Sequence, residues 1–357
     1  MVDRPDGQRP KCQRVVLRQR PRGPLDPADL AIEEYSVPEI EDGEFLVRNL
    51  FLSVDPMNRL HIDGSALGGA VPLLPLGATI PGAAVGEIVA SKHPDFAVGE
   101  VVEGRFGWQH YGVSRGDGVR RVNPALGGPE NALGVGGLPG FTAFIGLHSV
   151  GGVKPGQTVL VSGAAGAVGS VVGALVKARG GRAVAIASGE KRDYLMRDIG
   201  YDAVVDRKSP DFPEQLRNAL PDGADVYFDN VGGPMLAKIV PLMARGGTIL
   251  ICGLMALYEP DETAAVVDHL PPVLWAVMGK SLRIQGFGHV GNEHLRPAFE
   301  AEMADLLGRG ALKVPLQVRD GIEQVPQAMW GLFNQSVPGK VVIRVGERSQ
   351  DASSAQI

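Results

Sequence analysis

Residues 158–192 read TVLVSGAAGAVGSVVGALVKARGGRAVAIASGEKR. The run from Thr158 to Val161 is apolar and β-branched, which predicts a strand. Apolar residues then recur at helical spacing from Ala167 to Arg179, and the pair Gly180-Gly181 predicts the end of that helix. A second strand-like run follows from Ala183 to Ala187. The segment therefore predicts a strand, a helix and a second strand, the unit from which parallel sheets are built.

The turn between the first strand and the helix carries three glycines, which are Gly163, Gly166 and Gly169. Glycines at this spacing permit a tight turn, let backbone N–H groups approach a pyrophosphate, and let the helix pack closely on the strand. Because the turn lies between a predicted strand and a predicted helix, we interpret it as a dinucleotide site. A chain with 49 glycines also produces chance matches, so a turn that serves packing alone is the alternative.

The residues after the second strand indicate which dinucleotide binds. An NAD-binding unit carries an Asp or Glu about 20 residues after the glycines, which accepts from the ribose hydroxyl. This strand ends instead in Ala187-Ser188, and Lys191 and Arg192 follow. These cations oppose the dipole of the next predicted helix and are well placed to hold a phosphate. We therefore favour NADPH over NADH; a solvated basic pair, with Glu190 as a displaced ribose acceptor, is the alternative.

The composition of the chain excludes several classes of protein. Its 357 residues carry a net charge of −5, which offers no footprint for nucleic acid or for an anionic membrane. Its two cysteines, Cys12 and Cys252, can build neither a disulfide framework nor a Cys-rich zinc site, which indicates a reducing, cytoplasmic setting. Gly or Pro interrupts the long uncharged runs, so no membrane-spanning segment is expected.

The order of patterns along the chain predicts an α/β protein with two domains. Over residues 11–135, short β-branched segments separated by Pro, Gly and Asp turns predict a β-rich, barrel-like domain. Over residues 136–312, strands alternate with helices, which predicts a doubly wound parallel sheet. The chain is then expected to return to the first domain over residues 313–346 and to end in a disordered tail, 347–357.

Residues directly after the strands of such a sheet are candidates for ligand binding, because ligands bind beyond the carboxyl ends of the strands. In the second domain these candidates are Asn230, Cys252, Gly253, Leu254, Phe287, Gly288 and His289. Judged by position alone, Asn230 is about as well explained by a turn before Gly232-Gly233 as by a cofactor contact.

The chain lacks two common means of activating an alcohol. A catalytic zinc needs three protein ligands, and the histidines of the first half have no partners at ligand spacing. None of the six tyrosines has the Lys four positions later that a short-chain type of carbonyl reductase would use. Hydride transfer to an activated carbon–carbon double bond remains, because one or two hydrogen-bond donors can stabilise an enolate. Tyr258, after a predicted strand end, is the best donor, and an ordinary loop tyrosine is the alternative.

Six segments together resemble one known family. They are residues 52–56 (LSVDP), 107–109 (GWQ), 139–143 (PGFTA), 163–170 (GAAGAVGS), 227–233 (YFDNVGG) and 339–340 (GK). The sequence is similar to the zinc-free medium-chain dehydrogenase/reductases, in the branch of leukotriene/prostaglandin, plant double-bond and bacterial curcumin reductase-like enzymes. The resemblance covers nearly the whole chain from Arg14 to Val345. It implies a GroES-like β-rich domain split around a Rossmann domain, NADPH-dependent reduction of small α,β-unsaturated ketones and aldehydes, and a homodimer.

The same resemblance implies roles for individual residues. Lys191 would contact the adenosine phosphate, and Asn230 would lie along the cofactor. Tyr258 would donate a hydrogen bond to the substrate carbonyl. The remaining contacts would be Gly166, Ala167, Val168 and Gly169 at the pyrophosphate, Cys252, Gly253 and Leu254 beside the nicotinamide ribose, and Phe287, Gly288 and His289 at the nicotinamide. Asp55 stands where zinc-bearing relatives have their first Cys.

The chain departs from the family's usual pattern at four positions. Gly163 replaces an Ala, which is a mild change. Arg207 replaces a Tyr that contacts the cofactor, and it could add a second cation for the phosphate. Val337 replaces an Asn, which puts one cofactor contact in doubt. Met57 replaces a Tyr that often lines the substrate pocket, so the substrate is less well defined than the reaction.

Two other functions stay open at this point. A quinone reductase of the same superfamily would need no specific proton donor. A protein that binds NADPH in a sensory or structural role would need no turnover, because a cofactor fold does not by itself prove catalysis. The segment from Ala256 to Gly279 is expected to be an apolar loop that includes Trp275. It would form either a wall of the substrate pocket or a dimer contact.

Overall fold

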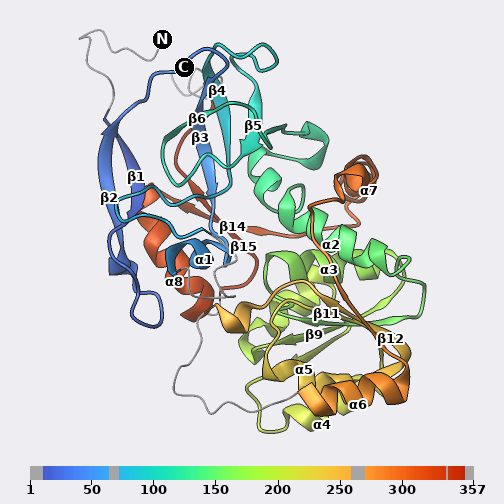
Figure 1. Ribbon diagram of the computed structural model, residues 1–357. Helices are drawn as coiled ribbons and strands as arrows, with labels where there is room; N and C mark the ends of the chain where they lie inside the picture. Colours follow the sequence, from blue (N-terminus) through green and yellow to red (C-terminus); the bar gives the residue numbers. More distant parts are fainter. Residues whose placement is uncertain (1–10, 64–71, 259–269, 335–336, 350–357) are drawn as a thin grey trace. The chain divides into compact units, whose positions relative to one another are not determined.

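The computed structural model describes residues 11–63, 72–258, 270–334 and 337–349. The contacts within the chain divide it into two compact units (Figure 1). Of the described residues, the first unit comprises 11–63, 72–133, 316–334 and 341–349, and the second comprises 134–258, 270–315 and 337–340. For comparison, the sequence predicts boundaries after residues 135 and 312.

The second unit contains the parallel sheet that the sequence predicts. Its six strands lie in the order β10-β9-β8-β11-β12-β13, and every neighbouring pair is parallel. In chain order they are β8 (Thr158–Ser162), β9 (Arg182–Ala187), β10 (Ala203–Asp206), β11 (Ala224–Asp229), β12 (Met243–Ile251) and β13 (Arg283–Gly286). The chain order reverses between β8 and β11, and a doubly wound sheet binds its ligand at that point. The predicted fold class is confirmed.

Helices cover both faces of this sheet. Figure 1 shows α4 (Phe212–Ala219), α5 (Pro234–Ile239) and α6 (Leu270–Lys280) on one face. The opposite face carries α2 (Leu138–Ser149), α3 (Ala167–Ala178) and α7 (Arg296–Gly308). Because both faces are covered, the inner strands β8 (TVLVS) and β9 (RAVAIA) read as almost continuous apolar runs rather than as alternating ones.

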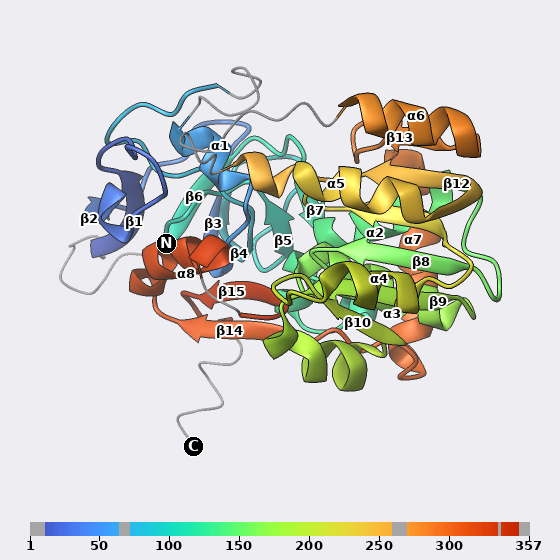
Figure 2. The ribbon, with the colours of Figure 1, turned by 90° about the horizontal axis from the view of Figure 1, so that it is seen from below.

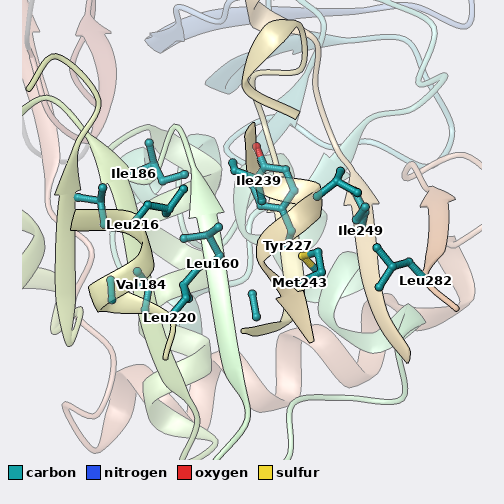
Figure 3. Packing of buried hydrophobic residues seen from close by; sticks show 14 of the residues in the cluster. Leu160, Val184, Ile186, Leu216, Leu220, Tyr227, Ile239, Met243, Ile249 and Leu282 are labelled. Carbon is teal, nitrogen blue, oxygen red and sulfur yellow. The ribbon is translucent and has the colours of Figure 1, made fainter. Parts of the chain in front are cut away.

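The core on the α4–α5–α6 face fixes the register of the central strands. Tyr227 of β11 lies between Leu160 of β8 and Ile249 of β12. All three side chains are buried, and they pack with Leu216 of α4 and Ile239 of α5 (Figure 3). The ends of β8, β11 and β12 are therefore held side by side at the edge where a ligand would bind.

Two elements of the second unit differ from the sequence pattern. The prediction of a loop from Ala256 to Gly279 is wrong from Leu270 onward, where α6 forms. The helix α6 packs against β12 through Val273. The run of Val, Leu and Pro in this segment did not reveal the helix in the sequence. The next helix that the sequence predicts after Ala187-Ser188 begins as a 3₁₀ turn, Gly189–Lys191, and continues into a π-helix, Tyr194–Ile199.

The first unit is rich in antiparallel strands. β1 (Lys11–Leu17) pairs with β2 (Leu30–Ser36). A second sheet has the order β14-β15-β3-β4-β5-β7, with β6 also paired to β3. These strands are β3 (Phe45–Ser53), β4 (Ala84–Ser91), β5 (Val101–Gly104), β6 (Tyr111–Ser114), β7 (Arg120–Arg121), β14 (Leu316–Asp320) and β15 (Lys340–Arg344). The short helix α1 (Asn58–Asp63) and the helix α8 (Val325–Asn334) complete the unit. The returning strands β14 and β15 lie side by side in Figure 2.

The carboxyl-terminal residues extend the first unit. Ser349 donates from both its backbone N–H and its hydroxyl to the carboxylate of Glu87 on β4. The rest of the predicted tail, from residue 350, lies outside the described residues. Among the helices that the structure describes, none combines the length and the apolar character needed to cross a membrane.

Candidate cofactor-binding site

The glycine turn lies directly after β8 and leads into α3. Gly163 has a φ of +58°, a left-handed conformation that glycine adopts without strain. Gly166 is the residue before the first turn of α3, and no described side chain caps that turn. Since the first N–H groups of a helix have no partner within it, Ala167, Val168 and Gly169 present donors at the positive end of the helix dipole. This arrangement suits a pyrophosphate.

The third glycine of the motif is required by close packing. A Cβ atom at Gly169 would stand 2.5 Å from the carbonyl oxygen of Gly163 and 2.7 Å from the Cα of Ala164. Both of these atoms belong to the backbone, so neither can move away as a flexible side chain could. A side chain at residue 169 would therefore push α3 away from the turn.

The loops after β11 and β12 meet the glycine turn at the reversal of strand order. A Cβ atom at Gly163 would lie 3.3 Å from the Cβ of Asn230. Asn230 donates from Nδ2 to the carbonyl of Ser162, at 2.8 Å, which leaves its side-chain oxygen as an acceptor. A Cβ atom at Gly253 would stand 2.9 Å from the carbonyl oxygen of Asn230. A Cβ atom at Gly232 would stand 2.7 Å from Cδ2 of Leu254. The structure thus brings together Gly163, Asn230, Gly253 and Leu254, four of the predicted site residues.

A cluster of cations follows the ends of β9 and β10. It consists of Lys191, Arg207 and Lys208, and we call it the basic cluster. Burial lowers the pKa of the half-buried Lys191, and the positive charge of Arg207 lowers it further. Lys208 binds Glu190 at 3.0 Å, so Glu190 is engaged as an ion-pair partner. A lysine whose pKa is lowered by burial and by neighbouring cations fits an additional dianionic phosphate, which would favour its charged form.

Lys208 belongs to this candidate site although it is not among the residues predicted from the sequence. The signal was available, because Arg207-Lys208 directly follows the end of a strand in a parallel sheet. Ser188, which the sequence identified, is buried at the end of β9, and its carbonyl accepts the N–H of Lys191 at 3.0 Å. This bond helps to fix the backbone from which Lys191 extends.

Tyr258 is buried at the end of a 3₁₀ turn, Met255–Leu257. Burial raises the pKa of its phenol, although a hydrogen bond from the backbone of Leu254 acts in the opposite direction. The hydroxyl therefore stays protonated at neutral pH and can donate a hydrogen bond. The N–H of Ala256 donates to the carbonyl of Val231 at 3.0 Å, so the loop that carries Tyr258 is joined to the loop after β11.

Cys252 lies next to this loop as a neutral thiol. Burial raises its pKa to about 12, and the nearby Asp229 adds to the increase. A thiol in this state is a poor nucleophile. Cys252 therefore contributes packing rather than covalent chemistry.

Several predicted residues are not brought into this group by the contacts that the structure gives. The ring of Phe287 packs edge-on against Phe228, with centroids 5.5 Å apart, while Gly288 and His289 are exposed. Trp275 is 74% exposed on α6, and Met57 of the first unit is 51% exposed. Their roles toward cofactor or substrate stay predictions.

Comparison with known proteins identifies the family of the chain. A family model described as the N-terminal domain of oxidoreductase matches residues 13–122, and one described as zinc-binding dehydrogenase matches residues 167–307. The NADPH-dependent curcumin reductase of Escherichia coli (strain K12) is 36% identical over 345 residues, covering 95% of this chain and 98% of that protein. The chain belongs to the medium-chain dehydrogenase/reductases.

Further relatives of this medium-chain reductase define its branch. The 2-alkenal reductase (NADP(+)-dependent) of Nicotiana tabacum is 32% identical over 342 residues, covering 93% of this chain and 97% of that protein. The crystal structure of CurA in complex with NADPH from Vibrio vulnificus matches with a TM-score of 0.87 at 33% identity, covering 94% of this chain and 99% of that one. The family predicted from the sequence is confirmed, and so is its two-domain fold.

A zinc ion, which the description of one family model implies, does not fit the residues of this medium-chain reductase. No group of three His, Cys, Asp or Glu side chains that could hold a metal occurs in the described parts of the chain. Asp55 binds the hydroxyl of Ser53, and Nε2 of His61 faces a guanidinium nitrogen of Arg105 at 3.1 Å. These side chains therefore offer no ligand set for a catalytic zinc in the described parts of the chain.

Proposed function

We propose that this medium-chain reductase uses NADPH to reduce the carbon–carbon double bond of small α,β-unsaturated ketones and aldehydes. The hydride would go to the β-carbon. Identity of 36% with the NADPH-dependent curcumin reductase along 95% of the chain carries the proposal. The name of the tobacco 2-alkenal reductase supports the substrate class, and the basic cluster supports the choice of NADPH.

Different residues of the chain would bind NADPH and stabilise the enolate in this reaction. NADPH, when bound, supplies the hydride. The first turn of α3 would hold the pyrophosphate, and Lys191 with Arg207 and Lys208 would hold the adenosine phosphate. Tyr258 would donate a hydrogen bond to the carbonyl oxygen of the substrate, where negative charge develops as the enolate forms. Water would then protonate the α-carbon.

Oxidation of NADPH in the presence of a panel of carbonyl compounds tests this function. We expect enones and enals to be consumed, and their saturated counterparts to be inert. Faster turnover of simple quinones would favour a quinone reductase. Tight binding of NADPH without consumption of any compound would favour a non-catalytic role.

Replacing Lys191 by alanine should weaken the binding of NADPH but not the binding of NADH. A charged hydrogen bond contributes about 1.5–3 kcal/mol, so we expect KM for NADPH to rise about 10- to 100-fold while KM for NADH stays unchanged. Lys154→Ala, an exposed lysine before β8, is the matched control. An equal rise in KM for both coenzymes would contradict the assignment of the phosphate site.

The affinity of the same site for NADPH, but not its affinity for NADH, should depend on pH in the alkaline range. Because the pKa of Lys191 is lowered from its ordinary 10.5, the side chain loses its charge at a lower pH than a free lysine would. Affinity for NADPH should therefore begin to fall on the alkaline side below pH 10.5, and affinity for NADH should not. Titration of coenzyme binding against pH measures this difference.

We also propose that the protein forms a homodimer through α6 and β13. The strand β13 ends the parallel sheet, so one of its edges has no partner strand among the described residues. Leu270, Leu274, Trp275 and Met278 of the neighbouring α6 are exposed, as is Ile284 of β13. Edge strands beside exposed apolar patches are typical of association sites.

Replacing Trp275 by glutamate should convert the dimer to a monomer. A charge placed at the centre of an apolar interface is left without a partner, so association should weaken by at least about 100-fold. Sedimentation or light scattering measures the mass. Val98→Glu, at an exposed apolar residue of the first unit, is the control and should leave the mass unchanged. A monomeric wild-type protein would contradict the proposal.

A cytoplasmic, reducing location completes the proposal. Its support is that neither cysteine, Cys12 or Cys252, forms a disulfide.

A further inference from the structure

Ser162 and Asp229 form a buried pair at the ends of β8 and β11. Ser162 is 1% exposed and Asp229 is 0% exposed. The hydroxyl of Ser162 donates to Oδ1 of Asp229 at 2.7 Å. The same oxygen accepts the backbone N–H groups of Val231, at 3.0 Å, and Gly232, at 2.9 Å. One carboxylate oxygen therefore gathers three donors and fixes the turn after β11.

Ser162 also holds Asn230 by two separate bonds. The backbone N–H of Asn230 donates to the hydroxyl of Ser162 at 3.0 Å. Its side-chain Nδ2 donates to the carbonyl of Ser162 at 2.8 Å. Both the main chain and the side chain of Asn230 are thus set by a residue on the neighbouring strand. The side-chain oxygen of Asn230 is left to accept from a ligand.

The backbone of Asp229 extends the network to a third strand. Its carbonyl accepts the N–H of Cys252, at 2.8 Å, and the N–H of Gly253, at 3.1 Å. These residues begin the loop that leads to Tyr258. The pair Ser162 and Asp229 therefore joins the ends of β8, β11 and β12, at the point where the three loops of the candidate site start.

One oxygen of this network lacks a partner. Within the described part of the chain, Oδ2 of Asp229 is buried without a hydrogen-bond partner, and the phenol of Tyr227 interacts with the side chains of both Ser162 and Asp229. An unpaired buried polar atom is destabilising, and apolar replacement of such groups is often neutral or stabilising. A carboxylate at this place is therefore better explained by the turn that it holds than by stability.

We propose that Ser162 and Asp229 are positioning residues of the cofactor site. They act through Asn230, whose side-chain oxygen they hold in the place where it accepts a hydrogen bond from NADPH. The inference rests on the proposed use of NADPH. It adds two buried residues, outside the glycine motif and the basic cluster, that set the affinity for the coenzyme.

The substitution Ser162→Ala tests this role. It removes the donor to Asp229 and the acceptor for the N–H of Asn230, so the dissociation constant for NADPH should rise about tenfold. In the free protein, amide hydrogen exchange at Asn230 and Val231 should become faster. Thr248→Val is the control, since it removes another buried hydroxyl of the same sheet, one that accepts from Arg283 at 3.3 Å and has no printed bond to Ser162, Asp229 or Asn230. It should leave both measurements unchanged.

A double-mutant cycle separates positioning from a general loss of stability. Asn230→Ala should weaken the binding of NADPH. Adding Ser162→Ala to this variant should lower the affinity for NADPH little further, because Ser162 acts through Asn230. Additive losses in NADPH affinity would overturn the proposal. So would wild-type affinity in Ser162→Ala, provided that the wild type binds NADPH. A wild type that does not bind NADPH rejects the proposed function instead.

Discussion

Replacing Gly169 by alanine is expected to raise the dissociation constant for NADPH by at least about 100-fold. The new Cβ would stand 2.5 Å from the carbonyl oxygen of Gly163, so the turn and the start of α3 must separate. The N–H groups of the first turn would then no longer converge on one pyrophosphate, and several hydrogen bonds of about 1 kcal/mol each would be lost together. Calorimetric titration with NADPH measures the loss.

The effect of Gly169→Ala on folding can be separated from its effect on binding. Overpacking of this kind costs about 1–3 kcal/mol of stability, which leaves a folded protein to titrate. Gly308→Ala, at an exposed residue where an added Cβ meets nothing within 4 Å, is the control and should bind normally. A folded Gly169→Ala variant with normal affinity would show that the glycine turn is not the pyrophosphate site.

Replacing Tyr258 by phenylalanine should lower kcat for an enone by about 100-fold. Loss of one donor to a developing oxyanion typically costs a factor of this size. Because the donor acts in the transition state, KM for NADPH should stay nearly constant. Steady-state kinetics with a saturating enone measures both constants.

The pH profile gives a second test of Tyr258. Its pKa is raised above the ordinary value of 10, so the phenol keeps its proton to higher pH than a free tyrosine. We therefore expect no alkaline fall in kcat from this residue below about pH 10.

Tyr111→Phe, in β6 of the first unit, is the control for the Tyr258→Phe variant. A fully active Tyr258→Phe variant would favour quinone reduction, which needs no specific donor.

The sequence predicts the fold well because its signals are local. The unit from Thr158 to Ala187 carries a strand, a glycine turn, a helix and a strand in order, and the structure confirms all four elements. The end of the helix before Gly180-Gly181 is also as predicted. These elements depend on residues that lie close together along the chain.

Features that depend on contacts between distant residues could not be predicted in this way. The bond between Ser162 and Asp229 requires the register of two strands whose residues are 67 positions apart. Lys208 joins Lys191 only because β9 and β10 end side by side. For α6, the apolar run between Pro272 and Gly279 fits a loop wall and a helix equally well, and packing against β12 decides between them.

The most direct test of the account follows the hydride itself. The protein is incubated with NADPH that carries deuterium at the transferred position of the nicotinamide and with a simple aryl enone, and the product is analysed by NMR. We predict a saturated ketone with deuterium on the β-carbon. Deuterium on the carbinol carbon of an allylic alcohol would contradict the account, because the protein would then reduce the carbonyl group rather than the double bond.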